Sequence, residues 1–92
     1  MYQVYILRCA DDSFYIGYAR DLVARVKAHN SRRGSRYTLQ RLPVEMVYAE
    51  SYDTRIIAIR RERQLKRWTR KKKEALIRGD AASLRVLSKR RT

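Results

Sequence analysis

Phosphodiester hydrolysis requires side chains of several kinds, and this sequence carries them at widely spaced positions. One group must accept a proton from the attacking water, a cation must balance the charge of the transition state, and the departing oxyanion must be stabilised. A lone glutamate can also hold Mg²⁺, because this ion commonly binds through one or two carboxylates and the phosphate oxygens of a substrate. The residues that could supply these functions are Tyr5, Tyr15, Arg25, His29 and Glu62. They can act together only if two strands and two helices bring them to one face of a small sheet.

The two tyrosines fall in a segment with the pattern of a β-hairpin. Residues 2–7 and 14–18 are rich in β-branched and aromatic side chains, and polar residues between them favour a tight connection. Side chains alternate between the faces of a strand, so Tyr5 and Tyr15 share a face only if the loop has an odd number of residues. A three-residue loop, Ala10-Asp11-Asp12, is therefore expected.

This loop predicts the partners of both phenols. Tyr5 would pair with Gly17 and Tyr15 with Leu7, and the missing side chain of Gly17 would leave open space opposite one ring. A two-residue loop would put the phenols on opposite faces of the sheet. From this segment alone, both tyrosines also fit a purely structural role as half-buried sheet residues.

The arginine and the histidine fall on one stripe of a predicted helix over about residues 21–31, which begins at an aspartate. Leu22, Arg25, Val26 and His29 have the spacing i, i+3, i+4, i+7 and therefore share a face. Leu22 and Val26 would pack on the sheet. Two polar residues beside an apolar stripe indicate the edge of a cleft.

Residues 30–38 break this helix with Asn, Ser and Gly and contain several arginines, hydroxyl groups and an aromatic ring, a composition that suits phosphate contacts. Pro43 then marks the start of a third strand over about residues 44–51. In this strand Val44, Met46 and Tyr48 are expected on one face, alternating with their neighbours. The expected fold is α/β of the α+β type, with a three-stranded antiparallel sheet flanked by about three to four helices.

Glu62 lies on a predicted helix over about residues 54–68, which Ser51 or Asp53 can cap. Glu62 is expected at the edge of the inward stripe formed by Ile57, Ala58, Leu65 and Trp68. Trp68 could instead stack on an exposed base, but its place on the apolar stripe favours core packing.

Two further helices are expected at the C-terminal end. The first runs over residues 70–78, capped by Thr69, packed through Ala75, Leu76 and Ile77 and stopped by Gly79, and the second covers about residues 80–87. Residues 89–92 are expected to be a frayed basic end. We interpret residues 1–79 as one domain, to which residues 80–92 add a short helix and a basic tail.

The composition indicates a polyanionic partner. Among 92 residues, 23 Lys and Arg against 9 Asp and Glu give a formal net charge of +14. A charge of this size repels itself in the compact state and is most easily explained by DNA or RNA, whose phosphates such residues contact through counterion release. The predicted contacts are Arg32, Arg33, Arg36, Tyr37, Arg63, Lys66, Arg67, Arg70, Lys71 and Lys72.

Other classes of protein fit the composition less well. No apolar run approaches the ~18 residues of a membrane-spanning helix, and the N-terminal segment lacks the pattern of a secretion signal. We therefore expect a cytoplasmic protein that does not bind membranes. One cysteine, Cys9, and one histidine cannot form an internal disulfide or a common Cys/His zinc site.

The same residues resemble the GIY-YIG nucleases, in particular their small, single-domain bacterial branch. Val4-Tyr5-Ile6 lies where that family has Gly-Ile-Tyr or a variant, and Tyr15-Ile16-Gly17 matches its second motif in full. Arg25 with His29 is similar to the family's Arg-x-x-x-His helix, and residues 58–62 are similar to the segment that ends in its metal-binding glutamate. Asn30, Gly34 to Thr38 and Pro43 to Tyr48 add to the resemblance, which covers about residues 2–78.

The resemblance implies a metal-dependent endonuclease acting on DNA in repair or processing, with Mg²⁺ or Mn²⁺ as cofactor. By motif, Tyr5 would be the general base or would position the water, and Tyr15 would help to position water and phosphate. His29 would hydrogen-bond a tyrosine or relay its proton, Arg25 would stabilise phosphate charge, and Glu62 would hold the metal. No separate specificity domain follows, so target choice is unexplained and a protein partner is an option.

Two alternatives stay open at this level. Glu62 could simply pair with Lys66 at i+4, a surface interaction of ~0.3–0.5 kcal/mol. The chain could then be a non-catalytic nucleic-acid-binding module of the same fold, or a basic protein associated with RNA or the ribosome. Tyrosine as a base adds a condition of its own: because its ordinary pKa is about 10, Arg25 and the metal must favour the phenolate.

Overall fold

The structure is a computed structural model that describes residues 1–89. Its elements run in the order β1 (Tyr2–Arg8), β2 (Phe14–Ala19), α1 (Leu22–Asn30), α2 (Arg36–Leu39), β3 (Glu45–Tyr52), α3 (Arg55–Lys66), α4 (Arg70–Arg78) and α5 (Ala81–Lys89). The three strands form one antiparallel sheet in the order β2-β1-β3. The predicted α+β fold with a three-stranded antiparallel sheet is confirmed.

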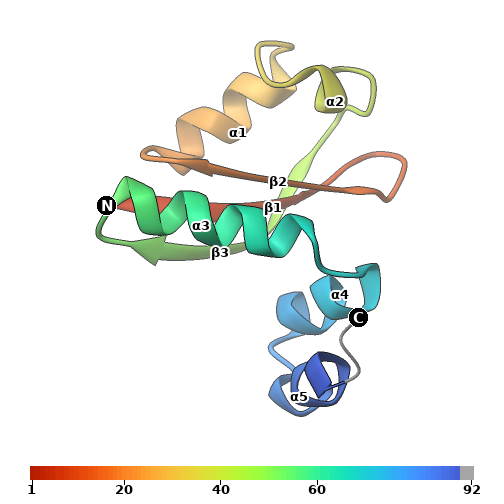
Figure 1. The fold of residues 1–92 in the computed structure, drawn as a ribbon. Coiled ribbons are helices and arrows are strands. Elements are labelled where there is room, and N and C mark those ends of the chain that lie inside the picture. The colour runs from red at the N-terminus through yellow and green to blue at the C-terminus, as the bar shows by residue number, and fades with distance from the viewer. Residues whose placement is uncertain (90–92) are drawn as a thin grey trace.

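Helices cover both faces of the sheet (Figure 1). Side chains of β1, β2 and α1 form one core cluster, which includes the buried residues Tyr5, Leu7 and Leu22. The alternate positions Val4 and Ile6 pack on the other face against α3. In Figure 1, α4 and α5 extend away from the sheet beyond the end of α3. Because β2 is an edge strand, side chains from α1 on one face of the sheet and from α3 on the other can meet beside it.

The hairpin has the predicted loop. Tyr5 lies opposite Gly17 and Leu7 lies opposite Tyr15. The Cys9 amide donates to the Ser13 carbonyl across 2.8 Å, which closes the three residues between them into the turn. The parity argument from the strand period is therefore confirmed.

The helix ends follow from their capping residues. Asp21 caps α1 by accepting a hydrogen bond from the Ala24 amide, and Thr69 caps α4 in the same way. Gly79 ends α4 in the left-handed conformation at φ 71°, as expected of a helix stop. α3 is capped by Thr54, whose hydroxyl accepts from the Ile57 amide at 3.3 Å. The predicted caps Ser51 and Asp53 are wrong, because Ser51 belongs to β3 and the helix begins only at Arg55, directly after Thr54.

The stripe of α3 differs from the prediction at one position. Ala58 and Leu65 are fully buried, but Ile57 is 46% exposed. The helix begins later than expected and ends at Lys66, so Trp68 lies beyond it. Trp68 still packs against the α3 core cluster, which confirms core packing.

Strand β3 contains an irregularity that the alternating pattern could not reveal. Tyr48 lies opposite Ile6, whereas Met46 lies opposite Leu7, so an additional residue is accommodated between them. The expected common face of Val44, Met46 and Tyr48 is therefore wrong. Val44 belongs to the α1 core cluster, and Met46 lies opposite Leu7 on the same face, whereas Tyr48 lies opposite Ile6 and packs against the α3 core cluster.

Two differences concern the remaining helices. Residues 36–39 form the short helix α2, where the sequence predicted only a loop. The expected C-terminal helix is present as α5 and includes Lys89, while residues 90–92 of the predicted basic end lie outside the described residues. None of the helices within residues 1–89 is long and apolar enough to cross a membrane.

Candidate active site

Tyr5 lies at the centre of the site and fills the space that Gly17 leaves. Its ring is 2% exposed. A β-carbon built on Gly17 would stand 2.6 Å from the Tyr5 hydroxyl and 3.2 Å from Cε2 of Tyr15. The predicted space opposite one ring is therefore present, and the phenol of Tyr5 occupies it. The Tyr5 and Tyr15 rings face the same side, with centroids 6.4 Å apart.

His29 approaches Tyr5 from α1 and is buried, with 1% of its surface exposed. Its Nε2 lies 3.2 Å from the Tyr5 hydroxyl, and its Nδ1 lies 2.8 Å from Oγ1 of Thr38. The Thr38 hydroxyl donates its one hydrogen to the Ser35 carbonyl at 3.1 Å, so it accepts from Nδ1–H of His29. This leaves Nε2 as the acceptor, and the Tyr5 hydroxyl donates to it.

The sequence does not predict the segment that positions His29, which is Ser35 with the short helix α2. Ser35 caps α2 by accepting from the Thr38 amide, and this turn fixes the buried Thr38 hydroxyl beside the imidazole. Gly34 packs directly on the ring, since a β-carbon there would stand 2.1 Å from Nδ1 of His29. The sequence predicts that the hydroxyls of this segment contact phosphate, whereas the hydroxyls of Ser35 and Thr38 position the histidine. The motif Ser-x-x-Thr is a capping signal that could have revealed α2.

Burial shifts the pKa of both members of the Tyr5–His29 pair toward the neutral forms. Loss of solvent raises the pKa of Tyr5, the neighbouring Tyr15 raises it further, and Arg25 opposes the shift. Burial also lowers the pKa of His29, and Arg25 lowers it further. Arg25 therefore acts in the expected direction on Tyr5, but its effect is smaller than that of burial. Both pKa shifts favour a neutral phenol that donates to a neutral imidazole at neutral pH.

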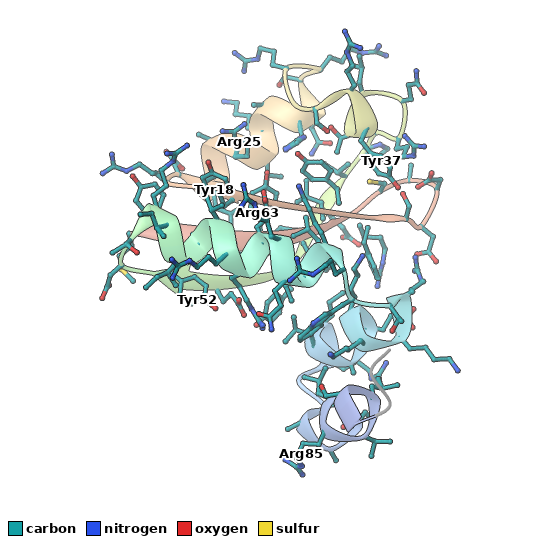
Figure 2. The ribbon with its side chains drawn as sticks, in the orientation of Figure 1. Tyr18, Arg25, Tyr37, Tyr52, Arg63 and Arg85 are labelled. Carbon is teal, nitrogen blue, oxygen red and sulfur yellow. The ribbon has the colours of Figure 1, made fainter. Side chains whose placement is uncertain are left out.

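Arg25 and Glu62 line a pocket of about 350 Å³ at the edge of the sheet. The other residues that line it are Tyr2, Tyr5, Tyr15, Gly17, Tyr18, Ala19 and Arg20. Arg25 is exposed on α1, as the predicted role in phosphate binding requires. Figure 2 draws the Arg25 side chain on α1 and that of Arg63 on α3, in the region of Tyr18. Arg20 and Tyr18 were missed because nothing in their spacing distinguishes them from other surface residues.

Glu62 reaches this pocket from the opposite helix layer. Tyr5, Tyr15, Arg25 and His29 belong to the α1 side of the sheet, whereas Glu62 comes from α3 on the other side. The expectation of one common face is therefore wrong for Glu62. The pocket extends across the edge strand β2, which joins the two layers.

Among residues 1–89, the Glu62 carboxylate forms an ion pair with one cation. Lys66 Nζ lies 3.5 Å from its Oε1, so the ion pair considered from sequence is present. The Glu62 side chain is 15% exposed and the Lys66 side chain 53% exposed. No group of three or more His, Cys, Asp or Glu residues that could enclose a metal ion is found in the described part of the chain. Glu62 fits the other arrangement, in which one carboxylate holds Mg²⁺ and water and phosphate complete the shell.

The predicted DNA contacts of the first group lie around α2. Arg32, Arg33 and Arg36 are exposed. Tyr37 stacks on Tyr15 with centroids 6.1 Å apart, and Arg41 covers its ring at 3.9 Å. Tyr37 therefore already makes contacts within the protein, yet 39% of its surface is exposed beside the candidate catalytic residues.

The second group lies on α3 and α4 and has more varied surroundings. Arg63 and Lys66 are exposed near the end of α3, and the exposed Arg67 follows as its C-cap. Lys71 lines the groove between α4 and α5, and Nζ of Lys72 lies 4.3 Å from the centre of the Trp68 ring.

Arg70 has the most intramolecular partners of this group. Its guanidinium donates to the Asp12 carbonyl, pairs with the Asp12 and Glu74 carboxylates, and lies 4.2 Å from the centre of the Phe14 ring. These contacts tie α4 to the hairpin. Its predicted contact with DNA is untested.

A small three-stranded α+β fold with tyrosine, arginine and glutamate around one pocket at the sheet edge defines a nuclease-type catalytic domain. The family called GIY-YIG catalytic domain matches residues 1–75, and the chain belongs to this family. It is therefore of the nuclease kind, a hydrolase whose family acts on DNA and generally uses divalent metal ions.

Similar proteins agree with this assignment. The UPF0213 proteins of Staphylococcus aureus strains Mu3 and N315 are each 50% identical over 74 residues, which cover 80% of this chain and 90% of theirs. The solution structure of the UPF0213 protein BH0048 from Bacillus halodurans is 38% identical, with a TM-score of 0.56 over 87% of this chain and 86% of that one. The solution structure of EF2693 from E. faecalis, also 38% identical, has a TM-score of 0.58 and covers 85% of this chain and 83% of its own.

Proposed function

We propose that this protein is a Mg²⁺- or Mn²⁺-dependent endonuclease that hydrolyses DNA phosphodiester bonds in the cytoplasm, with a preference for particular DNA structures, in repair or processing. The observation that carries the proposal is the chain of contacts from Thr38 through His29 to Tyr5, at a pocket that also holds Arg25 and Glu62. A tyrosine that only packed in the sheet would not require a positioned histidine, an arginine and a glutamate around its hydroxyl.

The geometry supports a proton relay. The Tyr5 hydroxyl can accept a proton from water while it donates its own proton to Nε2 of His29, so no free phenolate has to form. The lowered pKa of His29 keeps Nε2 unprotonated, and Thr38 holds the ring with Nε2 toward Tyr5. Tyr5 stays protonated at neutral pH because its pKa is raised, and the neutral His29 imidazole lies within hydrogen-bond distance to accept the phenolic proton.

The other residues have complementary roles. Arg25 is exposed at the pocket and can balance charge on the phosphate in the transition state. Tyr15 packs edge-on to His29, with centroids 5.2 Å apart, and can position water and phosphate beside Tyr5. Glu62 would hold the metal ion, which supplies Lewis-acid stabilisation of the phosphate and the departing oxygen when bound.

The direct test is cleavage of end-labelled single-stranded, duplex, flap and branched DNA, with RNA of the same sequence, in Mg²⁺, Mn²⁺ or EDTA. Wild-type protein is expected to cut DNA only with metal and to favour one structure, and Glu62→Ala is expected to abolish cutting. Glu45→Ala, at an exposed position at the start of β3, is the matched control and should cut normally. Binding of every substrate without cutting would instead favour a non-catalytic binding module, and preferred cutting of RNA would overturn the assignment of DNA as substrate.

A further inference from the structure

A second groove of about 210 Å³ adjoins the catalytic pocket and is lined by Phe14, Tyr15, Ile16, Tyr37, Lys66 and Lys73. Tyr15 lines both, so the two hollows share this tyrosine as a wall. The proposed function does not use this groove. Its composition, three aromatic rings and two ammonium groups, is that of a site for a ligand with both an apolar and an anionic part.

Lys73 is half-buried, and none of the described residues provides a counter-ion for its ammonium group. The structure gives it no ion pair or side-chain hydrogen bond within residues 1–89. The carboxylate of Glu74, its neighbour in sequence, is taken by Arg70 at 3.2 Å. Burial and the nearby Arg70 both lower the pKa of Lys73, because its charge is partly removed from water and faces another cation. A bound anion would supply the missing negative charge.

Lys66 connects this groove with the metal-binding carboxylate. It lines the groove and also pairs with Glu62 at 3.5 Å, one helical turn earlier on α3. Its side chain is 53% exposed, so it can exchange Glu62 for an anion in the groove at little cost. Two cations from α3 and α4 therefore border the space beside Tyr15.

The aromatic wall is held in a fixed orientation. Tyr37 contacts the Tyr15 ring and the Arg41 guanidinium, and Arg70 lies over the Phe14 ring. A nucleobase that stacked on Tyr37 would have to compete with these two contacts. The exposed edges of these rings can instead make apolar contact with a sugar or the edge of a base.

We propose that this groove binds the nucleotide next to the scissile phosphate, with its phosphate between Lys66 and Lys73 and its sugar and base against Phe14 and Tyr37. The inference extends the proposed function, since the neighbouring pocket is where the bond would be cut. It adds Lys73 to the DNA contacts, whereas the sequence had indicated Arg70, Lys71 and Lys72. It also explains why an aromatic cluster lies between the catalytic residues and α4.

The test measures binding of a fluorescent DNA oligonucleotide in EDTA at a series of salt concentrations, so that no cleavage is needed. For Lys73→Gln the slope of log K against log salt should fall by about 1, as expected when one phosphate contact is lost, and affinity should weaken severalfold. Lys73→Arg should restore the slope. Lys27→Gln, the same change at an exposed position of α1 outside the groove, is the control and should keep the wild-type slope.

Cleavage kinetics then separate this proposal from the one on which it rests. In an active enzyme, Lys73→Gln should raise KM and leave kcat near the wild-type value, because the nucleotide contact is present before and during the reaction. An unchanged slope and KM for Lys73→Gln in an active wild-type background would overturn the nucleotide site alone. Absence of cleavage by the wild type would overturn the nuclease function, and the salt dependence in EDTA would still decide whether the groove binds DNA.

Discussion

The hydroxyl of Tyr5 donates a hydrogen bond to Nε2 of His29 across 3.2 Å, and both residues are almost completely buried. This relationship joins the first strand to the end of α1. It also resolves the difficulty that a tyrosine is a weak base near neutral pH, because the imidazole can take the phenolic proton. The predictions below follow from this pair and its surroundings.

Thr38→Val removes the hydroxyl that orients His29 and keeps the shape of the side chain. The Nδ1–H of His29 would lose its acceptor, so the imidazole would no longer be held with Nε2 toward Tyr5. We expect a loss of about 1–3 kcal/mol in the free energy of unfolding, the usual cost of an unsatisfied buried donor, and a much slower cleavage step. Urea unfolding and single-turnover cleavage measure the two effects, and Thr38→Ser should restore both. Wild-type cleavage by Thr38→Val would contradict a positioning role for Thr38.

Gly17→Ala is expected to displace the Tyr5 phenol. The new β-carbon would stand 2.6 Å from the hydroxyl, so the ring must move away from His29. The matched control is Gly79→Ala, which meets no atom within 4 Å but forces alanine to a φ of 71°. The control should cost about 1–2 kcal/mol of stability and leave cleavage intact. Equal cleavage by both variants, measured under single-turnover conditions, would show that the position of the phenol does not matter.

The pH dependence should report His29 directly, because it is the one histidine in the sequence. Its pKa in the folded protein lies below the ordinary value of 6.5. The relay requires neutral His29, so cleavage should be constant through neutral pH and fall only at more acidic pH, below 6.5. The imidazole NMR signal, followed against pH, should titrate with the same midpoint as the rate.

The same shift predicts a change in stability. Between the folded and unfolded pKa values the unfolded chain binds more protons, so the free energy of unfolding rises with pH in this window. The contribution of His29 is complete above pH 6.5 and is lost as the pH falls through the lower, folded value. Urea unfolding at a series of pH values measures it. A His29 signal that titrates above 6.5 would contradict both predictions.

Metal binding should depend on Glu62 and compete with Lys66. Mn²⁺ should raise the Tm of the wild type, because a ligand that binds only the folded state stabilises it, and should not do so for Glu62→Gln. Lys66→Gln removes the ammonium 3.5 Å from the carboxylate. We expect it to lower the Mn²⁺ concentration needed by about twofold, in line with the small energy of an exposed pair. An equal Mn²⁺ response of wild type and Glu62→Gln, seen by thermal melting, would exclude Glu62 as the ligand.

The alternation of side chains along a strand and the period of the helix were sufficient to predict which of the four residues Tyr5, Tyr15, Arg25 and His29 share a face. The face shared by Tyr5 and Tyr15 depends only on the parity of the loop, and the step from Arg25 to His29 depends only on the helical period. Such relationships lie within one element or between paired neighbours. They are readable from sequence because few residues decide them.

The rest depends on contacts between distant segments. The irregularity in β3 turns Tyr48 to the α3 face of the sheet, and Ile57, in the first turn of α3, is 46% exposed. The spacing of Ser35 and Thr38 can indicate a helix cap, but only packing places Thr38 on His29, and only packing brings Lys73 and Tyr37 to one groove. Likewise, Glu62 approaches from the opposite helix layer because β2 happens to be the edge of the sheet. Tertiary packing, not local propensity, decides each of these.

Single-turnover cleavage by Tyr5→Phe, compared with Tyr52→Phe, tests the relay most directly. Each change removes one phenolic oxygen from the sheet, but the Tyr52 hydroxyl donates to Glu50 outside the catalytic pocket. With Mg²⁺ and the preferred DNA substrate, Tyr5→Phe should reduce the cleavage rate by at least about 100-fold, the lower range for general acid–base catalysis, while its affinity for DNA in EDTA stays that of the wild type. Tyr52→Phe should cut normally. A Tyr5→Phe protein that binds and cuts DNA at the wild-type rate would contradict a catalytic role for the Tyr5–His29 pair.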